Sequence, residues 1–174
     1  KWREQRKASE RNKRPYSDFS TFNVLIAKSV FSRIRFYEEL KQYGHEDTLL
    51  SFQLKNAGIK ILHIDNCLIH EGLESNREYL EKVKLSIENL SMLLDKVTDK
   101  SSFCSTLTML RSYRTLGFLR LSLLLAGIFI RYRERMEIAL ESGNKSNYFF
   151  VFYRMCMFCT YREIHRRKNI IAIF

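Results

Sequence analysis

The sequence predicts an α/β region over residues 1–99, followed by a basic α-helical tail over residues 100–174. Three observations lead to this prediction. The β-branched run at residues 59–64 is typical of a strand. Helical patterns lie before and after that run, so strand-like and helical segments alternate, as they do in α/β folds. Beyond residue 99 only helical patterns remain, and the first region is too short to be a complete α/β domain.

The N-terminal part of the chain opens on a polar, basic segment, Lys1–Arg14. This segment ends where Pro15 pushes the preceding residue towards extended geometry. Phe19–Ala27 mixes strand-forming residues with small polar ones, and it is predicted to be a short strand or a buried loop. Lys28–Tyr43 is amphipathic and is predicted to be helical as far as Gly44.

The next elements are a predicted helix and a predicted strand. Glu46–Ala57 is expected to be helical, with carboxylates in its first turn, where they interact favourably with the helix dipole. Gly58 is suited to the position that ends such a helix. Ile59–Ile64 is the predicted strand, and a turn then leads to a second extended piece, Cys67–His70.

Ser75–Val97 has the clearest helical pattern in the chain, because its apolar residues recur at spacings of three and four. Ser75 and Glu78 match the capping box that begins many helices. Two further helical stretches are expected, at about Phe103–Leu140 and Tyr148–Arg167.

The formal net charge of +11 is concentrated at the two ends of the chain. Residues 1–14 carry +5, residues 15–99 carry −3 and residues 100–174 carry +9. Basic ends favour partners that bear phosphate, such as a nucleotide substrate, an anionic membrane surface or nucleic acid. We expect no nucleic-acid partner, because the sequence has no recognisable binding motif and its middle is acidic.

Composition excludes several classes of protein. With 6 Gly, 1 Pro and 4 Cys, the chain is neither collagen-like nor a disulfide scaffold. The scattered cysteines indicate a reducing, cytoplasmic location. The most apolar stretch, Leu116–Ile130, contains Arg120 and is shorter than the roughly 20 residues that span a bilayer. The sequence opens at Lys1 with no signal peptide and no methionine, so we expect further sequence upstream.

The residues that suggest chemistry lie between Gly44 and His70. Two adjacent carboxylates, Glu46 and Asp47, follow the glycine at a predicted helix start, where a carboxylate can act as a general base towards a hydroxyl. His70 ends the second extended piece, and a histidine near acidic groups is a reasonable ligand for a divalent cation. The alternative is that the carboxylates simply begin a helix and that His70 lies in a loop.

These residues belong to an ordered set: an F-x-x-x-N segment ending at Asn23, then Gly44 before the pair Glu46 and Asp47, then His70. This order resembles the family 2 glycosyltransferases of the GT-A fold. More narrowly, it is similar to the galactosyltransferase C-terminal region of bacterial surface-polysaccharide enzymes. The resemblance covers about residues 10–80, which is under half of the chain.

The resemblance implies a nucleotide-sugar-dependent hexosyltransferase of polysaccharide synthesis, of which this chain would be the C-terminal part of the GT-A fold. Its partners would be a nucleotide-sugar donor and a saccharide or lipid-linked saccharide acceptor. Asp47, or in second place Glu46, would be the base that deprotonates the acceptor hydroxyl. Asn23, Gly44 and His45 would bind substrate.

His70 matches the third metal ligand of the family, for a divalent cation, manganese or magnesium, that would neutralise the leaving diphosphate. Arg11 and Arg14 could pair with phosphate through their guanidinium groups. The other interpretation of these two arginines is a solvated basic linker.

The sequence departs from the family in one large respect. No D-x-D metal motif is present, and the nucleotide-binding N-terminal half is absent. We therefore expect the cation to bind only together with that missing half, and the isolated chain to be inactive. The alternative function is a non-catalytic remnant, or an interaction module that needs a separate N-terminal half.

The tail, over residues 103–168, is rich in arginine and aromatic residues. Such helices can lie on an anionic membrane surface, so we expect peripheral contact at the inner face of the membrane. The alternative is that their apolar faces pack on one another. Cys156 and Cys159 have a zinc-like spacing, but buried thiols in a helical core are the simpler interpretation.

Overall fold

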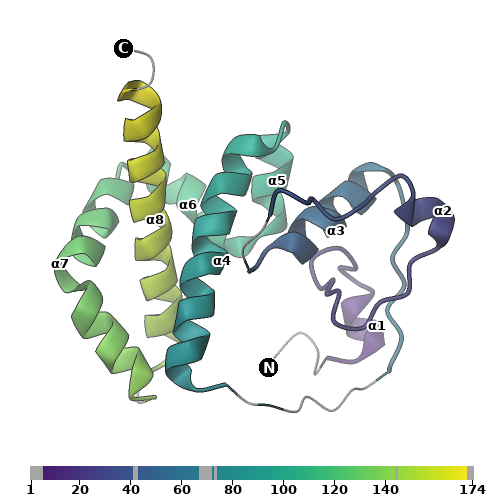
Figure 1. The fold of residues 1–174 in the computed structure, drawn as a ribbon, viewed down its shortest axis with the longest axis horizontal. Helices are drawn as coiled ribbons and strands as arrows, with labels where there is room; N and C mark the ends of the chain where they lie inside the picture. The colour runs from purple at the N-terminus through teal and green to yellow at the C-terminus, as the bar shows by residue number, and fades with distance from the viewer. Residues whose placement is uncertain (1–5, 41–42, 67–71, 73, 144, 172–174) are drawn as a thin grey trace. The chain divides into compact units, whose positions relative to one another are not determined.

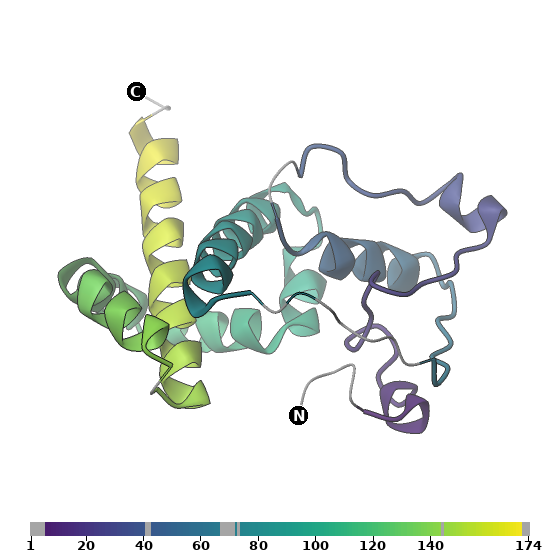
Figure 2. The same ribbon diagram turned by 60° about the horizontal axis from the view of Figure 1, so that its bottom comes forward.

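The computed structural model describes residues 6–40, 43–66, 72, 74–143 and 145–171, with side chains as far as residue 166. Within these ranges the regular structure is entirely helical, and the ribbons in Figures 1 and 2 carry no strand arrow. The predicted α/β fold, and with it the C-terminal part of a GT-A fold, is therefore wrong for the described chain.

The chain divides into two compact units. The first comprises Lys1–Lys41 and His45–Leu73, and the second comprises Gln42–Gly44 and Glu74–Phe174. The expected boundary between residues 99 and 100 separates a catalytic segment from a tail, and it stays a prediction. The helix over Asn76–Lys96 packs against the C-terminal helices and therefore belongs to the second unit.

In its described residues the first unit contains α1 (Ala8–Arg11), α2 (Lys28–Phe31) and α3 (Glu46–Asn56). Its small core forms where α3 packs against the loops around it. The buried members are Phe19, Leu50 and Leu54, and the half-buried ones are Ile26, Val30, Ile34, Ile59 and Ile61.

Residues 59–64, the predicted strand, are extended but pair with no neighbouring strand in the described chain. Side chains from the N-terminal segment bond to this backbone instead. The Tyr16 hydroxyl donates to the carbonyl of Ile59 at 2.9 Å. The Asn12 amide donates to the carbonyl of His63 and accepts from its N–H, both at 2.8 Å. Backbone groups that a sheet would have paired are thus satisfied without one.

The second extended piece, Cys67–His70, lies outside the described residues. Of the predicted helix Lys28–Tyr43, the structure describes residues 28–40 and 43, and among these only the four residues of α2 are helical. Phe19–Ala27 has no regular structure, so it is a loop and not a strand, but most of it is exposed and the predicted burial is wrong.

Helix α3 confirms the helix predicted over Glu46–Ala57 almost to the residue. Its end is a Schellman motif: the N–H of Ile59 donates to the carbonyl of Leu54 at 3.0 Å, and that of Gly58 to Lys55 at 3.1 Å. Gly58 has the left-handed φ of 69° that this motif requires. Ile59 also packs against the core that contains Leu54, which fixes the exit of the chain from the helix.

The second unit contains α4 (Asn76–Lys96), α5 (Lys100–Thr106), α6 (Thr108–Phe118), α7 (Ser122–Glu141) and α8 (Asn147–Ile171). Helix α8 packs against both α7 and α4, as Figure 1 shows. The fully buried large side chains of its core are Ile87, Leu90, Leu93, Phe103, Leu110, Tyr153, Met157 and Phe158. The capping box at Ser75 and Glu78 is confirmed, and α4 begins directly after it.

The helical stretch predicted over Phe103–Leu140 is broken twice. Leu107 has extended dihedral angles between α5 and α6, and Arg120 has a left-handed φ of 56° between α6 and α7. At the second break the N–H groups of Arg120 and Leu121 bond back to Gly117 and Leu116, which is again a Schellman motif. Glycine usually occupies the left-handed position, so an arginine there left no signal in the sequence.

No single described helix is long and apolar enough to cross a membrane. Helices α6 and α7 meet that test only when taken together, and the break between them bends the pair by 110°.

A bidentate ion pair between Arg162 and Asp95 joins α8 to α4. The Arg162 guanidinium donates to both carboxylate oxygens of Asp95, at 2.7 and 2.8 Å, and to the carbonyl of Ser91 at 2.8 Å. Burial by itself would raise the pKa of Asp95. The hydrogen bond and charge of Arg162, aided by His165, outweigh that effect and hold the pKa below the usual value of 3.8.

This ion pair makes stability depend on pH. Because the pKa of Asp95 is lower in the folded state, its contribution is complete well above pH 3.8 and is lost as the pH falls below that value. We expect Asp95→Asn to lower the free energy of unfolding by about 1 kcal/mol at neutral pH, since the carboxylate is partly exposed. Urea unfolding of the unsubstituted protein and of Asp95→Asn should show that their difference in free energy of unfolding shrinks as the pH falls below 3.8. Glu134→Gln, at an exposed position on α7, is the control, and an undiminished difference in acid would contradict the assignment.

Candidate active site

The two predicted catalytic carboxylates occupy the first turn of α3. Asp47 Oδ1 accepts a hydrogen bond from the Thr21 hydroxyl, which lies 26 residues earlier in the chain. Glu46 Oε2 is buried, and no described group bonds to it. In the part of the chain that the structure describes, no lysine or arginine is paired with either carboxylate. No described cation therefore neutralises either carboxylate, and Thr21 orients the second of them.

Two residues with left-handed backbone geometry precede this helix. Gly44 has φ 104° and His45 has φ 71°, so two left-handed residues in succession turn the chain into α3. Gly44 also lies close to α4: a Cβ placed on it would come within 2.6 Å of Ser86 Cβ. Only glycine fits there without displacing backbone. The predicted glycine-preceded helix start is thus confirmed.

His45 is half-buried, and its Nδ1 lies 3.2 Å from the hydroxyl of Thr48 in the first turn of α3. This contact holds the ring against the helix. The predicted substrate contacts of Gly44 and His45 stay predictions.

Asn23 lies on the exposed loop that also carries Thr21. Its amide donates to the carbonyl of Asn66 at 3.4 Å, across 43 residues of sequence. The loop therefore touches α3 through Thr21 and the end of the extended segment through Asn23. His70, the predicted metal ligand, lies outside the described residues.

The two arginines predicted to bind phosphate have different surroundings. Arg11 is bound within the first unit: its guanidinium lies 3.2 Å from His63 Nδ1 and donates to the carbonyl of Ile64 at 2.9 Å. A phosphate would have to compete with these partners. Arg14 is exposed, and its carbonyl accepts from the N–H of Ser17. A phosphate contact by either residue stays a prediction.

Sequence reasoning missed Thr21, although it lies inside the F-x-x-x-N segment. A threonine in a loop carries no signal of its own, because its partner Asp47 is distant in sequence. Only the fold brings the two together.

The described residues do not by themselves fit a divalent cation. No group of three His, Cys, Asp or Glu side chains converges among them, and the sequence contains no D-x-D. The cation therefore stays a prediction that depends on residues outside the described part.

The cysteine pair of α8 is not such a group either. Cys156 and Cys159 are fully buried, and burial raises the pKa of the two thiols to about 11 and about 12. Thiols that stay protonated at neutral pH are poor metal ligands. This agrees with the interpretation of buried thiols in a helical core.

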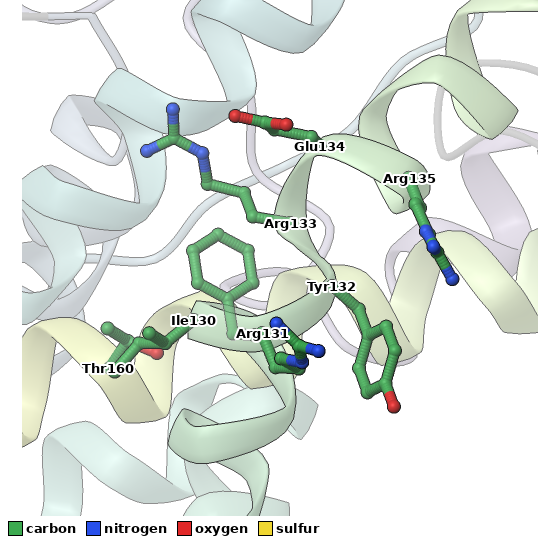
Figure 3. Close-up of a pocket in the computed structure, with 8 residues that line it drawn as sticks. Ile130, Arg131, Tyr132, Arg133, Glu134, Arg135 and Thr160 are labelled. Atoms are coloured by element: carbon green, nitrogen blue, oxygen red, sulfur yellow. The ribbon is translucent and has the colours of Figure 1, made fainter.

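A hollow of about 590 Å³ lies over α7 and is lined by Arg131, Arg133 and Arg135, together with Tyr132 and Thr160. Figure 3 shows that the three guanidinium groups point in different directions. They do not converge on one point, so the hollow is not a built anion site.

A scan against protein-family models, a search of curated proteins and a search of solved structures each found no match to this chain. The case for function therefore depends on the residues of the site.

Proposed function

We propose that this chain supplies the acceptor-side carboxylates of a nucleotide-sugar-dependent glycosyltransferase. Asp47 takes the proton of an acceptor hydroxyl as that oxygen attacks the anomeric carbon of the donor. The bond from the anomeric carbon to the diphosphate oxygen breaks, and the nucleoside diphosphate leaves with the electron pair. Glu46 accepts a hydrogen bond from a second hydroxyl of the acceptor.

One observation carries this proposal. Two segments that are distant in sequence and that both belong to the glycosyltransferase-like pattern, the loop that ends at Asn23 and the start of α3, are bonded to each other in the first unit. The loop of residues 20–23 is bonded to the start of α3 through Thr21 and Asp47, and to the segment before residue 67 through Asn23 and Asn66. An ordinary helix start would not require these ties.

The environment of Glu46 adds support. Its Oε2 atom is buried without a bonding partner among the described residues. Buried polar atoms in proteins almost always have partners, so this atom suits a ligand that supplies a donor. The hydroxyl groups of a saccharide are such donors.

We assign two roles to a separate N-terminal half: binding of the sugar donor and neutralisation of the charge on the leaving diphosphate. The reason is that this chain has no D-x-D motif. The test compares this chain with the polypeptide translated from the same reading frame extended upstream of Lys1. Both are incubated with manganese, a panel of nucleotide sugars and a lipid-linked saccharide extract, and release of nucleoside diphosphate is measured.

We expect acceptor-dependent release from the extended polypeptide and none from this chain alone. Release by this chain alone would contradict the division of roles. A folded extended polypeptide that is inactive with every donor, or a reading frame that stops just before Lys1, would favour a non-catalytic interaction module.

A further inference from the structure

The break between α6 and α7 presents a cluster of large apolar side chains to solvent. We call this cluster the elbow face; its members are Phe118, Leu119, Leu121, Leu123 and Leu124. Phe118 is 88% exposed, and Leu123 and Leu124 are 58% and 59% exposed. Isolated exposed leucines are common in proteins, but five exposed large apolar side chains within seven consecutive residues indicate an interaction surface.

The elbow face is separate from the sides of α6 and α7 that pack into the hydrophobic core. The opposite sides of α6 and α7 already pack inwards: Ala126 is buried with Met155 and Cys159 of α8, and Tyr113 and Leu116 pack against them. The inner and outer sides of the two helices are therefore distinct. The elbow face stays outside when the second unit is fully packed.

The backbone at the elbow is held in an unfavourable conformation. Arg120 is left-handed at φ 56°, a region that costs free energy for any residue with a Cβ. A continuous helix through this position would have avoided that cost. The bend of 110° instead joins the apolar end of α6 to the apolar start of α7.

The charged residues of the sequence segment that contains the bend are all basic. From residue 100 to residue 133 the sequence has no acidic residue; its charged members are Lys100, Arg111, Arg114, Arg120, Arg131 and Arg133. The acidic residue that contacts the start of α7 is Glu163. It accepts from the Ser122 hydroxyl at 3.3 Å, pairs with Arg166 at 3.6 Å and is mostly buried. The bend therefore carries basic charges along residues 100–133, and the carboxylate that contacts it, Glu163, is paired with Arg166.

We propose that the elbow face docks on an anionic lipid membrane, with its apolar side chains in the acyl region and Arg111, Arg114 and Arg120 among the lipid phosphates. Apolar residues surrounded by cations are the composition of membrane-surface segments. This surface lies wholly within the second unit, and it does not depend on the proposed transferase chemistry.

The test measures co-sedimentation of the full chain with vesicles of phosphatidylcholine alone, and with vesicles that also contain phosphatidylglycerol. We expect binding to the anionic vesicles that weakens with salt. Phe118→Ser should weaken partitioning roughly tenfold or more, because a large apolar side chain no longer leaves water. Arg120→Asn keeps a residue that tolerates the left-handed conformation and removes the charge, and it should weaken partitioning roughly fivefold.

Ile138→Ser is the matched control, because Ile138 is 68% exposed on the same α7 but lies away from the elbow. Its binding should equal that of the unsubstituted chain. Equal binding to neutral and anionic vesicles, or an equal loss with Ile138→Ser, would overturn the proposal. Self-association that Phe118→Ser abolishes, without vesicle binding, would assign the face to a second copy of the chain.

Discussion

Phe158→Ala is expected to lower the free energy of unfolding of the second unit by about 3–5 kcal/mol. The Phe158 side chain on α8 is fully buried, and its ring meets that of Tyr113 on α6 edge to face, with centroids 5.0 Å apart. Truncation would remove this contact and leave a cavity between the two helices. Since whole domains are stable by only about 5–15 kcal/mol, the effect should be large.

Urea unfolding followed by circular dichroism checks this expectation. Phe118→Ala is the matched control, because it removes the same atoms from a ring that is 88% exposed, and it should change stability by less than about 0.5 kcal/mol. Similar losses for the two variants would mean that α8 does not carry the core of this unit.

Asp47→Asn is expected to reduce transferase turnover by roughly 10²–10⁴-fold in the polypeptide that carries the donor-binding half. The amide has nearly the same shape as the carboxylate and can still accept from Thr21, but it cannot take a proton at neutral pH. The loss should appear in kcat, while KM for the donor stays nearly constant. Rates of nucleoside diphosphate release at saturating donor provide the measurement.

Two further variants separate catalysis from stability. Glu38→Gln alters an exposed carboxylate of the same unit and should leave turnover unchanged. Thr21→Val removes the hydroxyl that orients Asp47, so it should lower kcat less than Asp47→Asn, and Thr21→Ser should restore it. If Asp47→Asn keeps full activity while Thr21→Val loses it, Asp47 is not the base.

The helical parts of the molecule were largely predictable from local signals. The start of α4 follows from Ser75 and Glu78, and the end of α3 follows from Gly58, because capping groups act within a few residues of the helix end. The break at Arg120 was not predictable, since an arginine ordinarily continues a helix.

The site shows the same division. The pair Glu46 and Asp47 could be placed at a helix start from the sequence, because a glycine and two carboxylates mark such a start. The hydrogen bond between Thr21 and Asp47 could not be predicted, because the two residues are distant in sequence and only the fold brings them together.

The sequence alone determined α4 and α8 of the second unit, the charge of the tail and the carboxylates at the start of α3. The tertiary structure decided that residues 59–64 are not a strand. A β-branched run expresses a preference for extended geometry, and it becomes a strand only where another strand pairs with its backbone. Here Tyr16 and Asn12 bond to that backbone instead, and these partners lie about fifty residues away in sequence, beyond the reach of any local pattern.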